Sequence, residues 1–167
     1  MAYAMLGRRL LRFSFAVALL SVSALADEYK GPRPPKADIP YLLHADDLIQ
    51  TEVTEAKQDS QKKSATYTIP GAASSARTPL AEPIFLMEQG KMDPGTLELW
   101  RLDVRNGERV VSVTSGGRRH GAGGPLHLTV TKVADGLFRI EVDDILENGE
   151  YSLSPTGSNR AFCFEVY

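Results

Sequence analysis

Residues 126–142 read LHLTVTKVADGLFRIEV, two runs of alternating apolar and polar residues on either side of an Asp-Gly pair. Successive side chains of a β-strand point to opposite faces, so a period of two gives each run one apolar and one polar face. Asp-Gly favours the tight turns that connect paired strands, because such turns need a positive φ. This stretch therefore predicts a β-hairpin with one face in a core.

The same signature recurs along the chain. Asn106-Gly107 and Asn148-Gly149 separate further apolar runs, and no helical period of comparable length competes with them. The remaining predicted strands cover residues 84–87, 97–104, 110–113, 151–153 and 162–166. Sheets with one apolar face bury it by stacking. We therefore expect an all-β fold, an antiparallel β-sandwich of the immunoglobulin-like or jelly-roll-like kind with seven to nine strands. The period alone does not distinguish two stacked sheets from one sheet closed on itself.

Two segments are less regular. Residues 41–64 fit either a short helix or part of a hairpin at a sheet edge. Their β-branched residues favour the hairpin, in which the polar run 58–64 turns the chain back into a second strand at 65–69. In a strand over 97–104 both faces carry large apolar residues, because the neighbouring side chains of Leu99 and Trp100 would point to opposite faces. A β-bulge near Leu99-Trp100 would bring both sets into one core.

The first 26 residues have the layout of a secretory signal peptide. Arg8, Arg9 and Arg12 precede an apolar run at 13–20, and Ala24-Leu25-Ala26 supplies small residues for cleavage after Ala26. The alternative is a retained anchor helix, although the apolar run is short for a membrane span. Four prolines in residues 27–40 indicate a disordered, solvated tether. Residues 41–167 then form a single β-sandwich domain.

Charge narrows the range of partners. The 141 residues after Ala26 hold 16 Lys and Arg against 21 Asp and Glu, a net charge of −5. An acidic surface disfavours nucleic acid and anionic membranes, and we expect no stable membrane insertion after cleavage of the leader. Cys163 is the only cysteine, so no disulfide can form within the chain. Its neighbours Phe162 and Phe164 favour a buried, unreactive thiol.

The glycine-rich stretch SGGRRHGAGG at 115–124 is the best candidate for ligand binding. It lacks the Lys-Ser/Thr and the following helix of a nucleotide-binding loop. Its backbone amides together with Arg118, Arg119 and His120 could still hold a carboxylate or sulfate. The alternative is a solvated link between two strands.

Other candidate sites carry weaker signals. His44, Asp46 and Asp47 could contribute ligands to a divalent metal, although metal sites need three or four converging groups and a solvated acidic stretch explains these residues as well. We find no Gly-x-Ser-x-Gly elbow and no acid pair placed across a cleft, and so expect no catalytic residues and no cofactor. Trp100 and the tyrosines could stack on a sugar, but core packing is the simpler explanation for Trp100.

Several stretches resemble uncharacterised exported bacterial proteins. They are Tyr41–Asp46, Ala76–Pro83, Asn148–Pro155 continuing through Gly157-Ser158-Asn159, and Phe162-Cys163-Phe164, about a quarter of the chain after the leader. The Gly-Glu-Tyr turn into a strand also resembles many unrelated β-sandwich modules. The resemblance implies no particular activity or ligand.

The sequence thus predicts an exported, non-enzymatic β-sandwich protein, periplasmic or extracellular. Its role would be that of an accessory or interaction module of the cell envelope with a protein partner that the sequence does not identify. One alternative is a small-ligand or carbohydrate-binding module that uses loop 115–124 or exposed aromatic residues. A second alternative is a metal-dependent hydrolase centred on His44.

Overall fold

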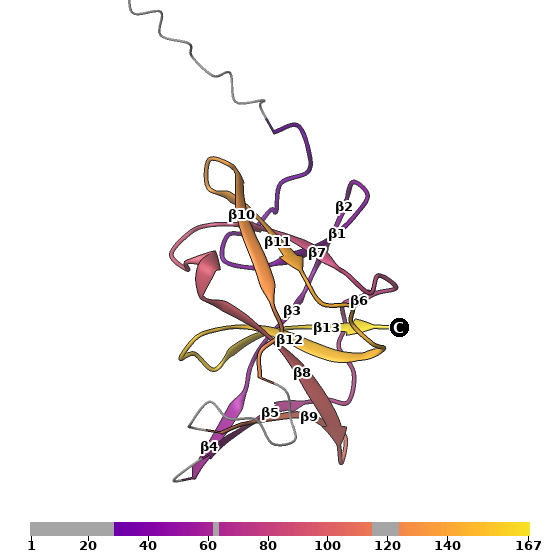
Figure 1. Ribbon diagram of the computed structural model, residues 1–167, viewed down its shortest axis with the longest axis vertical. Helices are drawn as coiled ribbons and strands as arrows, with labels where there is room; N and C mark the ends of the chain where they lie inside the picture. The colour runs from indigo at the N-terminus through magenta and orange to yellow at the C-terminus, as the bar shows by residue number, and fades with distance from the viewer. Residues whose placement is uncertain (1–28, 62–63, 115–123) are drawn as a thin grey trace, which may run out of the picture.

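The computed structural model describes residues 29–61, 64–114 and 124–167 as two packed β-sheets (Figure 1). The smaller sheet has the strand order β10 (Leu128–Ala134), β11 (Leu137–Val142), β7 (Ile84–Glu88), β1 (Tyr41–His44) and β2 (Asp47–Gln50). The larger sheet has the order β3 (Glu52–Glu55), β13 (Arg160–Val166), β12 (Gly149–Pro155), β8 (Leu97–Arg105), β9 (Glu108–Thr114), β5 (Ser64–Pro70) and β4 (Lys57–Gln61).

The all-β sandwich class is confirmed. Within the described ranges the helical structure is one 3-10 turn, Pro94–Thr96, and no helix there is long and apolar enough to cross a bilayer. The described residues form thirteen strands, more than the seven to nine expected, because the polar segment 47–61 supplies three of them. The strands pair antiparallel except where the two-residue β6 (Arg77–Thr78) runs parallel to β13, and an isolated parallel bridge joins Ala37 to Glu88.

Two of the three predicted turns connect paired strands, whereas Asn148-Gly149 leads into β12, which pairs with β8 and β13 and not with the preceding β11. Asn106 and Gly107 have φ values of 52° and 79° between β8 and β9, and Gly136 has a φ of 71° between β10 and β11. Glycine adopts this left-handed region without a steric penalty. Residues 41–50 form the hairpin β1–β2 rather than a helix. Of the run 58–64 expected as a polar turn, residues 58–61 belong to β4, which pairs with β5, and the return strand expected at 65–69 lies within β5.

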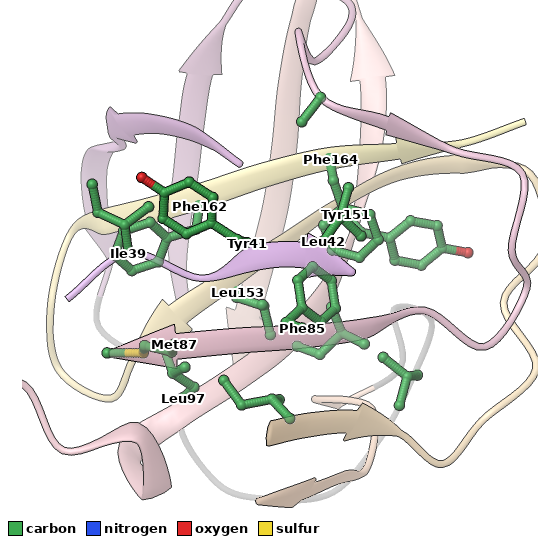
Figure 2. Packing of buried hydrophobic residues seen from close by; sticks show 14 of the residues in the cluster. Ile39, Tyr41, Leu42, Phe85, Met87, Leu97, Tyr151, Leu153, Phe162 and Phe164 are labelled. Atoms are coloured by element: carbon green, nitrogen blue, oxygen red, sulfur yellow. The ribbon is translucent and has the colours of Figure 1, made fainter. Parts of the chain in front are cut away.

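One face of the two central strands β12 and β13 packs on the smaller sheet. Figure 2 shows side chains of β1 and β7 meeting those of the central strands across an apolar layer. Phe164 lies at its centre, with ring centroids 5.1 Å from Phe85 in an edge-to-face arrangement and 5.6 Å from Tyr151 in a stacked one. Aromatic pairs in these geometries add to the stabilisation that comes from burial.

The opposite face of the central strands is buried as well. A second cluster there contains Ala56, Ile69, Leu102, Ala161 and Cys163. It explains the apolar residues on both faces of β8: Leu99 belongs to the first cluster and Leu102 to the second. The predicted bulge at Leu99-Trp100 is therefore wrong, and β8 pairs with β12 in unbroken register from Leu97 to Leu102.

The second face is covered because the larger sheet closes on itself. β3 and β4, at the two ends of its strand order, are one length of chain joined through the buried Ala56, whose N–H donates to the carbonyl of Asn159 at 2.8 Å. The first half of this length pairs with β13 and the second half with β5. The β4–β5–β9 part of the sheet consequently folds over the central strands.

Residues 29–40 differ from the solvated tether predicted for 27–40. Pro34, Ile39 and Pro40 are buried, and the Asp38 carboxylate accepts hydrogen bonds from the backbone amides of Gly90, Lys91 and Met92. These bonds lower the pKa of Asp38 despite its partial burial, which acts in the opposite direction. The segment 29–40 thus packs on the sandwich.

Candidate functional site

The largest fully buried side chain is that of Arg109, at 1% exposure on β9. It lies on the same face of β9 as Val111, which packs against the second cluster. Its guanidinium donates to the carbonyls of Gly71 and Pro70 at 3.0 and 2.8 Å, to the hydroxyl of Ser74 at 2.6 Å, and to both oxygens of Glu52 at 2.7 and 3.2 Å. These bonds match the five N–H donors of an arginine.

A second carboxylate completes this buried ionic cluster. Glu150, on β12, lies 3.7 Å from the Arg109 guanidinium. It accepts two hydrogen bonds of 3.1 Å from the amide of Ser74 and a third from the Ser74 hydroxyl. The amide of Ser75 in turn donates to Glu52 at 3.0 Å. The cluster therefore ties the loop after β5 to three strands that are distant in sequence.

Cys163 lies beside the cluster and is fully buried on β13. Burial raises the pKa of Cys163 to about 12, although the positive charge of Arg109 acts to lower it. Burial has the largest influence on the pKa of Arg109 and acts to lower it, but the hydrogen bonds that Arg109 donates to Glu52 and the nearby negative charges together outweigh burial, and the net shift is upward. The guanidinium therefore remains charged and the thiol protonated near neutral pH, as the sequence predicts for an unreactive cysteine.

The chemistry open to the ionic cluster is limited by its closure. Ser74 and Glu150 resemble a nucleophile and a base, yet both are buried and their polar atoms bond within the cluster. A catalytic serine needs space beside its oxygen for the reacting carbon of a substrate. We interpret the cluster as structural, since it fixes the loop 71–76.

Exposed apolar side chains occur at a different place, where β6 and the carboxyl end lie together (Figure 1). Ile145 is 78% exposed, Leu80 43% and Tyr167 52%. Backbone hydrogen bonds hold their segments side by side, from Leu146 to the carbonyl of Ala81 at 2.8 Å and from Tyr167 to that of Thr78 at 3.1 Å. Contiguous apolar patches mark contact surfaces, whereas single exposed apolar side chains are common on folded proteins.

An acidic depression is lined by residues close in sequence to Leu80 and Ile145. It has a volume of about 560 Å³, is open to solvent, and is lined by Glu82, Ile84, Thr129, Glu141, Val142 and Asp143. Leu80 lies two residues before Glu82, and Ile145 lies two residues after Asp143. We call the group Leu80, Glu82, Glu141, Asp143 and Ile145 the Ile145 surface.

The candidate metal ligands lie on the β1–β2 hairpin. Nε2 of His44 is 2.9 Å from the hydroxyl of Thr78, a hydrogen bond that occupies this ring nitrogen. Asp46 and Asp47 are exposed at the turn and the start of β2. Within residues 29–61, 64–114 and 124–167 no group of three His, Cys, Asp or Glu side chains is arranged to hold a metal ion. The geometry therefore adds no support for a metal site at His44.

The remaining candidates are placed unevenly. Arg118, Arg119 and His120 lie outside the described residues, so the predicted anion site stays a prediction. His127, on the approach to β10, is exposed with its Nδ1 3.3 Å from Asp144. Trp100 is half-buried on β8, and Tyr151 is a core residue whose hydroxyl donates to the carbonyl of Glu147 at 2.7 Å.

Sequence reasoning missed both the ionic cluster and the Ile145 surface. The available signal for Arg109 is its position two residues before Val111, which puts a charge on an apolar strand face. The partners Glu52, Ser74 and Glu150 are each at least 35 residues from Arg109 and share no motif with it. Ile145 is an apolar residue in the acidic turn segment 143–147, which gives no sign of its exposure.

Comparison with known proteins adds no assignment: no family model, no curated protein and no solved structure matches this chain.

Proposed function

We propose that the chain is an exported, non-enzymatic β-sandwich module that binds a protein partner through the Ile145 surface. The observation that carries this proposal is the exposure of Ile145 and Leu80 on segments fixed by backbone hydrogen bonds. Binding sites built on a rigid scaffold lose little conformational entropy when a partner docks.

The location follows from the amino-terminal sequence. The basic head, the short apolar run and the small residues at 24–26 form a leader that would direct export with cleavage after Ala26. The net charge of −5 after Ala26 favours a protein partner over nucleic acid or an anionic membrane. We assign the mature protein to the periplasm or the extracellular space as an accessory of the cell envelope.

The proposal that the module is not an enzyme rests on the ionic cluster. Its serine, carboxylates and guanidinium are the described groups that most resemble catalytic machinery, and they satisfy one another in the interior. Their bonds provide a structural reason for each of these residues.

Site-specific cross-linking in cells tests the partner. A photoreactive amino acid replaces Ile145 in one variant and Val104, which is 50% exposed on β8, in a matched control. We expect a discrete adduct with a second protein at position 145 and none at position 104. Equal adducts at both positions, or none at either, would contradict binding through the Ile145 surface.

Fractionation tests the location independently. The mature chain, with Asp27 as its first residue by mass spectrometry, is expected in the periplasmic or extracellular fraction. An uncleaved chain in the membrane fraction would show a retained anchor instead.

A further inference from the structure

We infer that the Ile145 surface binds a basic peptide segment in which a large apolar side chain adjoins lysine or arginine. This inference rests on the proposed function and specifies the chemistry of the partner. It follows from the way charge and apolar exposure are combined at one place.

The carboxylates of the depression are incompletely neutralised. Glu141 pairs with Arg139 at 2.9 Å, and Asp143 accepts a hydrogen bond of 3.1 Å from the neutral hydroxyl of Thr129. Glu82 is exposed and makes no side-chain hydrogen bond or ion pair within the described residues. Among the described residues no cation pairs with these two negative charges, and their electrostatic potential favours a positive side chain in the depression.

The apolar part of the surface flanks this charge. Ile145 and Leu80 lie on the two segments that the Leu146–Ala81 hydrogen bond joins, and each is two residues from a lining carboxylate. A peptide with a cation in the depression would thus place its neighbouring side chains against Ile145 and Leu80. Burial of apolar area would then supply affinity, while the ion pairs would set orientation.

Other occupants fit less well. A second copy that docked through the same surface would bring Glu82 and Asp143 of one molecule toward those of the other, and like charges oppose such pairing. An acidic segment or a nucleic acid would meet the same repulsion. A bare divalent metal would lack three suitably arranged ligands among the described residues.

The test uses the full mature chain, residues 27–167, labelled with ¹⁵N and titrated with three synthetic peptides. The first consists of lysine, leucine and glycine, the second replaces each lysine by glutamate, and the third replaces each leucine by serine. We expect the first peptide to shift the amide signals of residues 80–82 and 141–146. The glutamate peptide should shift none of them, and the serine peptide should bind ~10-fold more weakly because apolar burial is lost.

Matched variants locate the charge. The pair Glu82→Lys and Asp143→Asn should weaken binding of the lysine peptide ~10-fold or more, and raised salt should weaken binding to the unaltered chain as well. Glu108→Lys, an exposed charge reversal on β9, should leave the affinity unchanged. Unaltered amide spectra outside the substituted sites would show that each variant is folded.

Three results would overturn the inference: no shift of these signals at ~1 mM lysine peptide, a concentration that detects even weak contacts; equal binding of the glutamate peptide; or equal weakening by Glu108→Lys. An adduct at position 145 in cells with no peptide binding would leave the proposed function standing and remove the basic partner. Peptide binding without that adduct would show that the surface binds a basic peptide and would contradict the proposed cellular partner.

Discussion

The two faces of the central strands β12 and β13 are buried by opposite means. One face presents Tyr151 and Phe164 to an apolar layer, where contacts have no strict direction. The other carries a smaller apolar cluster that includes Cys163, and beside it Glu150 faces the charged guanidinium of Arg109, whose contacts are directed hydrogen bonds and ion pairs. The same two strands therefore experience a purely apolar environment on one side and a mixed apolar and ionic one on the other.

This difference determines how each face responds to substitution. An apolar layer tolerates substitutions that conserve volume, because dispersion and solvent exclusion depend on shape more than on orientation. A buried ionic cluster contributes little net free energy when complete, yet removal of one member leaves a charge without compensation. Substitutions that conserve volume on the apolar face should therefore cost little stability, whereas removal of one charged member of the ionic cluster should cost much more.

The largest expected effect concerns access to Cys163. Thiol reagents attack the thiolate, and burial both raises the pKa of Cys163 to about 12 and excludes the reagent. We expect labelling of the native protein at pH 8 to be ~1000-fold or more slower than in denaturant, as measured by absorbance of the released chromophore. Labelling of the native protein within a few-fold of the unfolded rate would show that the ionic face opens readily.

Arg109→Met should give the largest loss of stability. The substitution leaves Glu52 and Glu150 without their cation in the interior, at a cost of about 3–5 kcal/mol in the free energy of unfolding, as measured with urea. The control is Arg105→Met, which breaks an exposed pair with Asp103 worth about 0–1 kcal/mol. Similar losses of unfolding free energy in the two variants would show that the buried arginine contributes no more to stability than the exposed one.

Asp38→Asn separates the effect of charge from that of burial. The Asp38 carboxylate accepts hydrogen bonds from three backbone amides near the surface. We therefore expect the substitution to lower the free energy of unfolding by about 1–2 kcal/mol at neutral pH, as measured with urea. Because the pKa of Asp38 is lowered in the folded state, its contribution is present above the ordinary value of 3.8 and disappears as pH falls through the lowered value.

The difference between wild type and this variant should therefore narrow in acid. Asp59→Asn, at an exposed position on β4, serves as the control and should change stability little at any pH. A constant difference between wild type and Asp38→Asn down to strongly acidic pH would mean that the charge contributes nothing.

The smallest effect is expected on the apolar face. Phe164→Leu keeps a large apolar side chain in contact with Phe85 and Tyr151, and should cost about 1–1.5 kcal/mol in thermal or urea unfolding. A loss as large as that of Arg109→Met would place the apolar face, rather than the ionic one, in control of stability.

The sequence predicts the fold where local chemistry decides it. Asp135-Gly136 and Asn106-Gly107 mark hairpins because their residues tolerate positive φ, and alternation assigns the apolar faces beside them. β4 is invisible to the same reasoning, since KQDSQ has no apolar face and becomes a strand only by pairing with β5. Tertiary pairing there outweighs local preference.

Long-range contacts explain the other differences. The prolines of residues 27–40 predict an extended backbone, but the burial of Ile39 and Pro40 depends on a surface built by strands far along the chain. The ionic cluster likewise joins Glu52, Arg109 and Glu150 across three separate strands. No local sequence pattern predicts contacts between residues so far apart in the chain. The position of Arg109 on an apolar strand face does indicate that its charge needs a buried partner.

The shared length of chain at residues 52–61 has a consequence for the order of assembly. Its second half, β4, can pair with β5 early, because β5 follows it directly in the chain. Its first half, β3, can pair only once β13 is present, since Glu55 aligns with Arg160 near the end of the chain. Contacts between such remote residues are slow to form, because a long loop must be closed first. A chain that stops before β13 would have all the strands of the smaller sheet, but β3 would lack its partner and β12 would keep only β8 of its two neighbours.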